Sequence, residues 1–201
     1  VEISTSPPIV VYRETVTKTG QEIMGKSPNK HNHIFFTVEP LPESISQAIK
    51  DSKIPSGRIK KKDPTIRDAF VEAGMDSKEA VKVKNVFNGN VFVDNTRGQV
   101  HIGEVIEMIL DMFEDIMKAG PLCKEPSINC KVVLQDMKLH EDAIHRGPAQ
   151  MYPAVREGIR GTMMTAGPVL FEPLQTLRIE APKDYMGEIS KLVQNKRGQL
   201  L

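Results

Sequence analysis

The sequence predicts an α+β fold, in which a mixed sheet carries helices on one of its faces. Segments rich in β-branched residues predict strands, and the clearest of them are 9–16, 33–41 and 128–139. One long segment, 104–118, has the hydrophobic periodicity of an amphipathic helix. Strands and helices also do not alternate strictly along the chain, as they do in doubly wound parallel sheets. These three observations together favour the α+β class.

The elements of the first half are short and are separated by polar segments. We expect 9–16 and 33–41 to form a hairpin with a long link, because polar residues with glycine and proline join them. A short helix is expected at 44–50 and another at 65–73. Between them, 54–64 is basic and interrupted by proline and glycine, which predicts an exposed loop.

The middle of the chain contains the clearest helix. Before it, 86–93 predicts a strand that Asn88-Gly89-Asn90 interrupts with a bulge or a tight turn. In 104–118, charged residues recur at three- and four-residue spacing opposite an apolar face, so one side of this helix is expected to be exposed. A strand at 128–139 and a loop at 140–149 follow.

Another helix is expected from Pro153 to Ala166, with Pro153 in its first turn. Its core-facing residues are expected to be Val155, Ile159 and Met163. Arg156 and Arg160 lie one turn apart on another side of the same helix.

The pattern changes after residue 172, which divides the chain into a first domain, 1–172, and a tail, 173–201. The tail begins with a predicted strand, Leu177–Ala181, and continues with a helix, Asp184–Lys196, whose N-cap is Asp184. One strand and one helix cannot enclose a core, so we expect the tail to be the opening half of a truncated second domain.

Composition limits the class of protein but does not identify a partner. The 201 residues carry 27 basic and 26 acidic side chains, and the net charge of +1 requires neither a nucleic acid nor a membrane. No apolar stretch is long enough to span a bilayer, and we expect a cytoplasmic location without a membrane partner. Cys123 and Cys130 fit no usual zinc or redox spacing, so we expect two buried thiols. The chain begins at Val1, and we expect it to be part of a longer protein.

The segment Gly20–Ser27 has the spacing of a phosphate-binding loop, G-x-x-x-x-G-K-S. That chemistry needs a helix directly after the loop, whose N-terminal amides face the phosphates. Here Pro28–Asn32 follows, and the next predicted element is a strand. The nearest candidate for the acidic partner ends Val91–Asp94 and leads into a turn. An exposed basic hairpin loop is therefore favoured, and a P-loop nucleotide hydrolase stays open as an alternative.

The histidines do not form a recognisable metal or catalytic motif. His31 and His33 flank one asparagine, and His140 and His145 are five residues apart. No third cysteine or acidic ligand stands at a supporting interval, so no metal ion is expected. The sequence has no Gly-x-Ser-x-Gly segment and no Ser-His-Asp order, and we expect no catalytic residue.

The loop before the last helix of the first domain is the most informative segment. It offers His145 and Arg146 beside Gly147, and these side chains can contact a phosphate or a base edge while the glycine lets the backbone approach closely. From these residues alone, an ordinary polar loop is still the favoured interpretation.

Several motifs, taken in order, resemble archaeal and eukaryotic elongation factor 2. Asp142–Gly147, with Gln150 after it, resembles the diphthamide loop of that family, and Lys26–Asn32 resembles its companion tip loop. Further matches are Tyr12–Val16, Gly120–Cys123 and Asn195–Gln199. The match covers nearly the whole chain. Gly147-Pro148-Ala149 stands where eukaryotic members typically carry three glycines, and is similar to the archaeal form.

This resemblance implies a C-terminal fragment: a fourth domain with a ribosomal-protein-like βαβ fold, followed by a truncated ferredoxin-like βα half of a fifth domain. The fourth domain would be the tip that enters the small-subunit decoding site and contacts tRNA and mRNA during GTP-driven translocation. His145 would be the histidine that is modified to diphthamide. The RNA-contacting tip would consist of Lys26, Ser27, Pro28, Asn29, Lys30, His31, Asn32, Asp142, His145, Arg146 and Gly147.

The resemblance also implies partners and cofactors. The partners would be the ribosome, tRNA and mRNA, the diphthamide-synthesis enzymes, and ADP-ribosylating toxins of the diphtheria class. GTP and magnesium would bind a domain outside this chain, so no cofactor and no enzymatic activity are expected here. A generic RNA-binding module that uses the basic cluster Arg58–Lys62 stays open as a second alternative.

Overall fold

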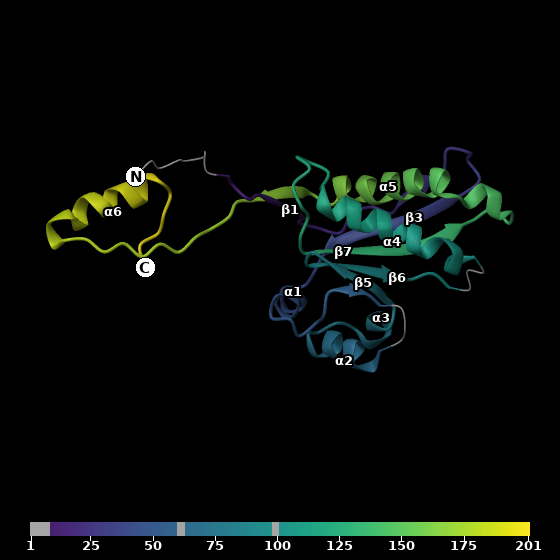
Figure 1. Ribbon diagram of the computed structural model, residues 1–201, viewed down its shortest axis with the longest axis horizontal. Coiled ribbons are helices and arrows are strands. Elements are labelled where there is room, and N and C mark those ends of the chain that lie inside the picture. The colour runs from purple at the N-terminus through teal and green to yellow at the C-terminus, as the bar shows by residue number, and fades with distance from the viewer. Residues whose placement is uncertain (1–8, 60–62, 98–100) are drawn as a thin grey trace, which may run out of the picture.

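The computed structural model describes residues 9–59, 63–97 and 101–201 (Figure 1). Within these ranges, a six-stranded sheet has the order β2-β3-β7-β6-β5-β4, and a separate ribbon pairs β1 with β8. The strands are β1 (Arg13–Val16), β2 (Ile23–Lys26), β3 (His33–Pro40), β4 (Gly57–Arg58), β5 (Val83–Phe87), β6 (Asn90–Asp94), β7 (Cys130–Lys138) and β8 (Pro168–Phe171). Only β6 and β7 are parallel in the described sheets, so the predicted mixed sheet is confirmed.

Helices pack on this sheet, as predicted. They are α1 (Glu43–Lys50), α2 (Pro64–Glu72), α3 (Ser77–Ala80), α4 (Ile102–Lys118) and α5 (Pro148–Thr165). A further helix, α6 (Met186–Asn195), lies in the tail, and η1 (Ala143–Arg146) and η2 (Lys183–Tyr185) are short 3₁₀ turns. The long helices α4 and α5 lie side by side on one face (Figure 1). None of the helices in the described part of the chain is both long and apolar enough to cross a membrane.

The strand pairing near the N-terminus differs from the predicted hairpin between 9–16 and 33–41. β1 pairs with β8 instead, and Glu14 lies opposite Leu170. Part of the predicted link forms β2, which pairs with one edge of β3, while β7 pairs with the other edge. Because a strand has only two hydrogen-bonding edges, none is left on β3 for β1.

The larger core lies between the sheet and the helices α4 and α5. Alternate residues of Ile34–Val38 in β3 are buried against these helices. α5 approaches β2 so closely that a Cβ atom at Gly25 would lie 1.8 Å from the carbonyl oxygen of Ala154. A Cβ atom at Gly158 would likewise lie 2.6 Å from Cδ2 of Phe36. Glycine at these two positions lets α5 rest directly on the sheet.

A second, smaller core lies on the opposite face, where α1, α2 and α3 cover β5 and β6 (Figure 1). Val91 and Val93 of β6 face this core, whereas Phe92 between them faces the larger one. Phe70 of α2 is fully buried here. The sheet therefore has helices on both faces, in addition to the predicted helices on one face.

The structure differs from the prediction at the start of α5 and within the strand predicted at 86–93. α5 begins at Pro148, and Pro153 lies inside the helix rather than in its first turn. Pro153 removes one N–H that would donate to the carbonyl of Ala149, but Ala149 is exposed and water can satisfy that oxygen. The interruption in 86–93 is a tight turn between β5 and β6, with positive φ at Asn88 and Gly89.

Glu14 is a buried acid that fixes the loop after α4. Its carboxylate accepts hydrogen bonds from the backbone N–H groups of Leu122, Cys123 and Glu125 at 2.7, 2.8 and 3.0 Å. The backbone of this loop faces inward, and the side chain of Cys123 is exposed while Cys130 is buried. The expectation of two buried thiols is therefore wrong for Cys123.

The tail 173–201 lies apart from the main body (Figure 1). The predicted strand Leu177–Ala181 is absent, since residues 172–182 have no regular secondary structure. A strand needs a hydrogen-bonding partner, and the described residues provide none at this point. α6 follows as predicted, but its N-cap is Tyr185 rather than Asp184. The domain boundary at residue 172 stays a prediction.

Candidate nucleic-acid interface

Two loops that are distant in sequence meet at the end of the molecule opposite the tail (Figure 1). One loop, 27–32, connects β2 to β3, and the other, 139–147, connects β7 to α5. The side-chain amide nitrogens of Asn29 and Asn32 both donate to the carbonyl oxygen of His145, at 3.1 and 2.8 Å. These bonds join the two loops into one tip.

The first loop is a tight turn closed by its own hydrogen bonds. The backbone N–H of Ser27 donates to the carbonyl of Asn32 at 3.0 Å, and that of Lys30 donates to the carbonyl of Ser27 at 2.7 Å. Lys30 has a φ of 64°, in the left-handed region. The chain reversal leaves Lys30 and His31 exposed and buries Ser27.

Asn32 is fully buried and bonded at both ends of its side chain. Its Nδ2 donates to His145, and its Oδ1 accepts from the backbone N–H of His140 at 3.1 Å. Gln150, in the first turn of α5, adds a further tie by accepting from the backbone N–H of Asn29 at 2.8 Å. A buried amide with both groups satisfied fixes the geometry of the tip and is not available to a ligand.

Arg146 also holds the tip from inside. Its guanidinium donates to the carbonyl oxygens of His140 and Glu141 and pairs with the carboxylate of Glu104 in α4. The hydrogen bond from Arg146, followed by one from His101, lowers the pKa of Glu104. The side chain of Arg146 is 4% exposed, so it does not present the ligand-facing cation that the sequence predicted.

Three imidazole rings gather at the tip. The ring centroid of His31 lies 4.9 Å from that of His140 and 5.0 Å from that of His145, and the latter two are 4.5 Å apart. His31 is exposed, and the other two are partly exposed. Asp142 caps the turn that carries His145 by accepting from the backbone N–H of Ile144 at 3.1 Å. Rings in this arrangement can stack on or hydrogen-bond to an unpaired base or a ribose.

The predicted tip residues fall into three groups by exposure. The exposed residues are Lys26, Pro28, Lys30, His31 and Asp142. The partly exposed residues are Asn29, His145 and Gly147. The buried residues are Ser27, Asn32 and Arg146. The first two groups can touch a ligand, whereas the third sets the shape of the tip.

Sequence reasoning missed three residues of this site. His140 lies two residues before the segment that the resemblance singled out, and Gln150 was part of the match but was given no role. Glu104 lies 42 residues from Arg146 in the sequence, and no local pattern connects the two. Each of the three acts by holding or completing the tip.

The structure does not support a phosphate-binding loop at Gly20–Ser27. Ile23–Lys26 form β2, and the next element is the strand β3 rather than a helix. β2 is committed to antiparallel pairing with β3, so its backbone cannot cradle phosphates as a loop does. Among the described residues, no group of three His, Cys, Asp or Glu is arranged to hold a metal ion.

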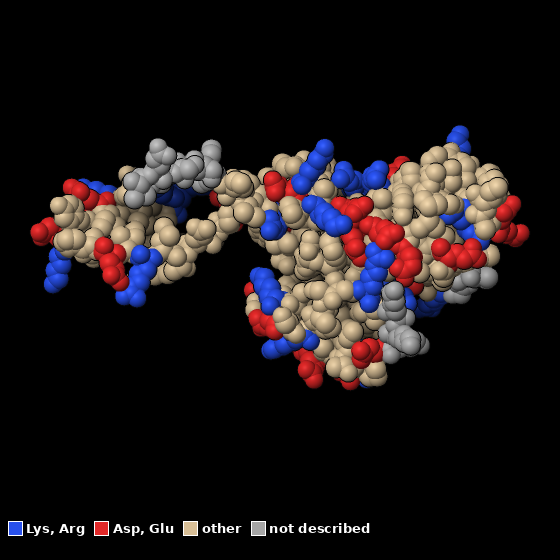
Figure 2. All heavy atoms as spheres, viewed as in Figure 1, with Lys and Arg blue, Asp and Glu red and all other residues tan. Residues whose placement is uncertain are grey.

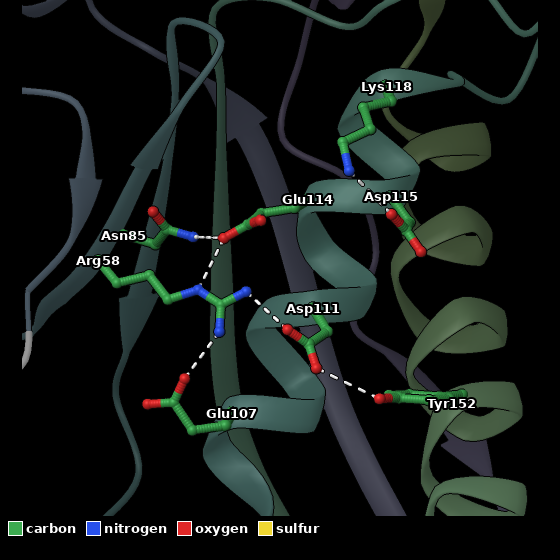
Figure 3. A network of polar contacts seen from close by, with 8 residues as sticks. All are labelled: Arg58, Asn85, Glu107, Asp111, Glu114, Asp115, Lys118 and Tyr152. Carbon is green, nitrogen blue, oxygen red and sulfur yellow. Dashed lines mark hydrogen bonds and ion pairs between the residues drawn. The ribbon is translucent and has the colours of Figure 1, made fainter.

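In the alternative of a generic RNA-binding module that uses the basic cluster Arg58–Lys62, Arg58 is not free to bind RNA. Arg58 of β4 donates to Glu107, Asp111 and Glu114 of α4 at 2.7, 2.6 and 2.8 Å (Figure 3). The hydrogen bond with Glu114 is the main cause that raises the pKa of Arg58. A cation shared among three carboxylates attracts RNA poorly. Lys60–Lys62 lie outside the described residues.

The fold and the joined loops define an α+β domain with a cationic, imidazole-bearing tip. The chain belongs to the family of elongation factor G, domain IV, whose family model matches residues 53–167.

Curated relatives extend the match to the whole chain. It is 49% identical over 201 residues to elongation factor 2 of Thermococcus onnurineus. It is 48% and 50% identical, over 202 residues, to elongation factor 2 of Pyrococcus furiosus and of Methanocaldococcus jannaschii. All of this chain is covered, but it spans only 27 to 28% of the length of these relatives.

Proposed function

We propose that this chain is the tip-bearing part of a ribosomal translocation factor, which enters the small-subunit decoding site and contacts tRNA and mRNA. The observation that carries the proposal is the double hydrogen bond from Asn29 and Asn32 to the carbonyl oxygen of His145. It makes two distant loops into one preorganised surface. The family membership and the elongation factor 2 relatives support the same role.

The tip suits recognition by shape rather than by sequence. Double-stranded RNA offers a wide minor groove with 2′-hydroxyls and phosphates, and a protein serving every codon must avoid reading bases. Lys26 and Lys30 are exposed and form no ion pair with another described residue, so they are free to contact phosphates. His31 and His145 can contact ribose or an unpaired base from the same surface.

The direction of translocation would be set by another domain of the longer protein. That domain would bind GTP and magnesium, and hydrolysis of the GTP would drive the tip into the decoding site. The protein would act in the cytoplasm. This chain would then occupy the space behind the codon–anticodon duplex and hinder its backward movement. It would have no catalytic residue of its own.

His145 is proposed as the position converted to diphthamide. Its ring is partly exposed on a capped turn, while its backbone is fixed from behind by the two asparagines. Diphthamide-synthesis enzymes, and toxins of the diphtheria class that ADP-ribosylate the product, would reach the ring from the solvent side.

Binding of RNA tests the proposed tip. The probe is an end-labelled RNA duplex of about 12 base pairs, titrated with the 201-residue chain over a series of KCl concentrations. Each lost phosphate contact lowers the slope of log affinity against log salt by about 0.9. Lys26→Gln and Lys30→Gln should each lower it, whereas Lys191→Gln in α6 should not. Slopes for the two tip variants that match the control would refute the proposal.

Modification is tested by mass. The chain is produced with and without the diphthamide-synthesis enzymes, and the tryptic peptide Leu139–Arg146 is measured. A mass increase should occur only with the enzymes. Because this peptide also contains His140, the increase should persist in His140→Gln and vanish in His145→Gln. An unmodified peptide, or modification at His140, would contradict the assignment.

Nucleotide binding separates the proposal from the remaining enzymatic alternative. A fluorescent GTP analogue should not bind the chain, because Gly20–Ser27 lacks the geometry of a phosphate-binding loop. Binding that Lys26→Ala abolishes would instead support the hydrolase.

A further inference from the structure

A basic hollow lies between the C-terminal half of α4 and the exposed side of α5. Lys124, Arg156 and Arg160 line it together with Met112, Asp115 and Ile116, and its accessible volume is about 320 Å³. This volume accommodates a phosphate group with some of its water. The hollow is separated from the tip by the first turns of α5, and none of its lining residues belongs to the two tip loops.

The three cations of this basic hollow have no acidic partner. None of them pairs with a carboxylate of a described residue within 4.0 Å. Asp115, the acid in the lining, is already paired with Lys118 at 3.1 Å. The hollow therefore carries a surplus of positive charge that the fold itself does not balance.

Arg160 is held in place rather than free in solvent. Its Nη2 donates to the carbonyl oxygen of Ala119 at 3.0 Å, and its Nε is buried without a hydrogen-bond partner. An anchored guanidinium loses little side-chain entropy when it binds an anion, and its planar fork matches the oxygens of phosphate. Arg156 and Lys124 are exposed and can close on the same anion from two sides.

The neighbouring charges indicate the path of the ligand. Glu107, Asp111, Glu114 and Asp115 form an acidic row on α4, which Figure 2 shows in red between basic side chains. This row repels a polyanion, so a strand that enters the basic hollow is directed along α5. α5 begins directly after the tip, and Arg156 and Arg160 lie about 12 and 18 Å along it from Pro148 at 1.5 Å per residue.

We propose that Lys124, Arg156 and Arg160 bind a backbone phosphate of the same RNA whose other part contacts the tip. This inference rests on the proposed function. It adds a second contact, distant from both loops, that sets the direction in which the RNA crosses the domain. An extended acidic protein is a poorer ligand, because the acidic row beside the hollow would oppose a broad surface more than a single phosphodiester strand.

The test uses the same RNA duplex and salt series, with variants of the hollow. Arg156→Gln and Lys124→Gln replace exposed side chains and should leave the unfolding midpoint unchanged. The double variant should lower the salt slope by about 0.9, since the contact with one phosphate is lost. Arg178→Gln, in the exposed tail, is the matched control and should change nothing.

Nuclear magnetic resonance of the arginine Nε–Hε groups locates the contact. Addition of the duplex should shift the signals of Arg156 and Arg160 together with the backbone signals of the tip. Inorganic phosphate at the same phosphate concentration should shift Arg156 and Arg160 much less, because it makes no second contact at the tip.

The outcomes separate this inference from the proposed function. If Lys30→Gln weakens RNA binding while the hollow variants do not, RNA binding by the basic hollow is refuted and RNA binding by the tip is supported. If the hollow variants weaken binding and the tip variants do not, the basic hollow binds RNA but the proposed tip is refuted. Equal shifts with phosphate and with duplex would indicate a free-anion site and overturn the RNA assignment. Absence of any shift up to millimolar duplex would overturn both proposals.

Discussion

Replacement of Asn32 by alanine should separate the two loops of the tip. Asn32 is fully buried, and its side chain connects to His145 at 2.8 Å and to His140 at 3.1 Å. In Asn32→Ala the N–H of His140 loses its acceptor, and the carbonyl of His145 keeps only Asn29 as a donor. The Nδ2 of Asn32 also donates to the hydroxyl of Ser27 at 3.2 Å, so three hydrogen bonds are lost and one backbone donor is left unsatisfied, at a cost of about 2 to 4 kcal/mol.

Two readouts together check the magnitude and the location of this effect. Urea unfolding gives the change in the free energy of unfolding, and amide hydrogen exchange shows whether 139–147 loses protection before the rest of the chain. Asn195→Ala is the matched control, because Asn195 is exposed in α6. Asn32→Asp keeps the volume but places an acceptor against the carbonyl of His145, and it should destabilise the chain at least as much. A cost for Asn32→Ala within about 0.5 kcal/mol of the control, with unchanged exchange at the tip, would refute the coupling of the loops.

Three further results are expected. Glu14→Ala should lower the free energy of unfolding by about 3 to 5 kcal/mol in urea titrations, because three backbone donors lose a charged acceptor, and an effect below about 1 kcal/mol would contradict this. At pH 8, iodoacetamide should label Cys123 but not Cys130, whose pKa burial raises to about 11, as peptide mass spectrometry can show. The pKa of Glu104 is lowered by Arg146, so its contribution is present above its unfolded pKa, about 4.3, and is lost as pH falls through the folded value. Glu104→Gln should therefore destabilise the chain at pH 7 and progressively less as the pH falls below about 4.3, and an effect that does not change with pH would exclude the ion pair.

Local patterns predicted the parts of the fold whose cause is local. The apolar face of 104–118 gave α4 almost to the residue, because seven of its side chains are buried at helical spacing. The turn at Asn88-Gly89 could also be predicted from local sequence, because asparagine and glycine favour the positive φ that the turn requires. The partner of β1 was not visible, because β8 lies more than a hundred residues away and nothing in either strand identifies the other.

The tip could be predicted as a pair of loops but not as a geometry. The resemblance brought Lys26–Asn32 and Asp142–Gly147 into one site, and the bonds from Asn29 and Asn32 to His145 place them together. The roles within the site were not predictable from residue type. Arg146 has the chemistry of a phosphate ligand, yet Glu104 and two carbonyl oxygens draw it inward.

The close approach of α5 to β2 at Gly25 and Gly158 has a mechanical consequence. At these two glycines the backbone of the helix lies directly against the hairpin, which leaves little room for α5 to move relative to β2 and β3. We therefore expect a rotation applied at the β1–β8 end of the body to be carried to the two loops at the other end with little loss.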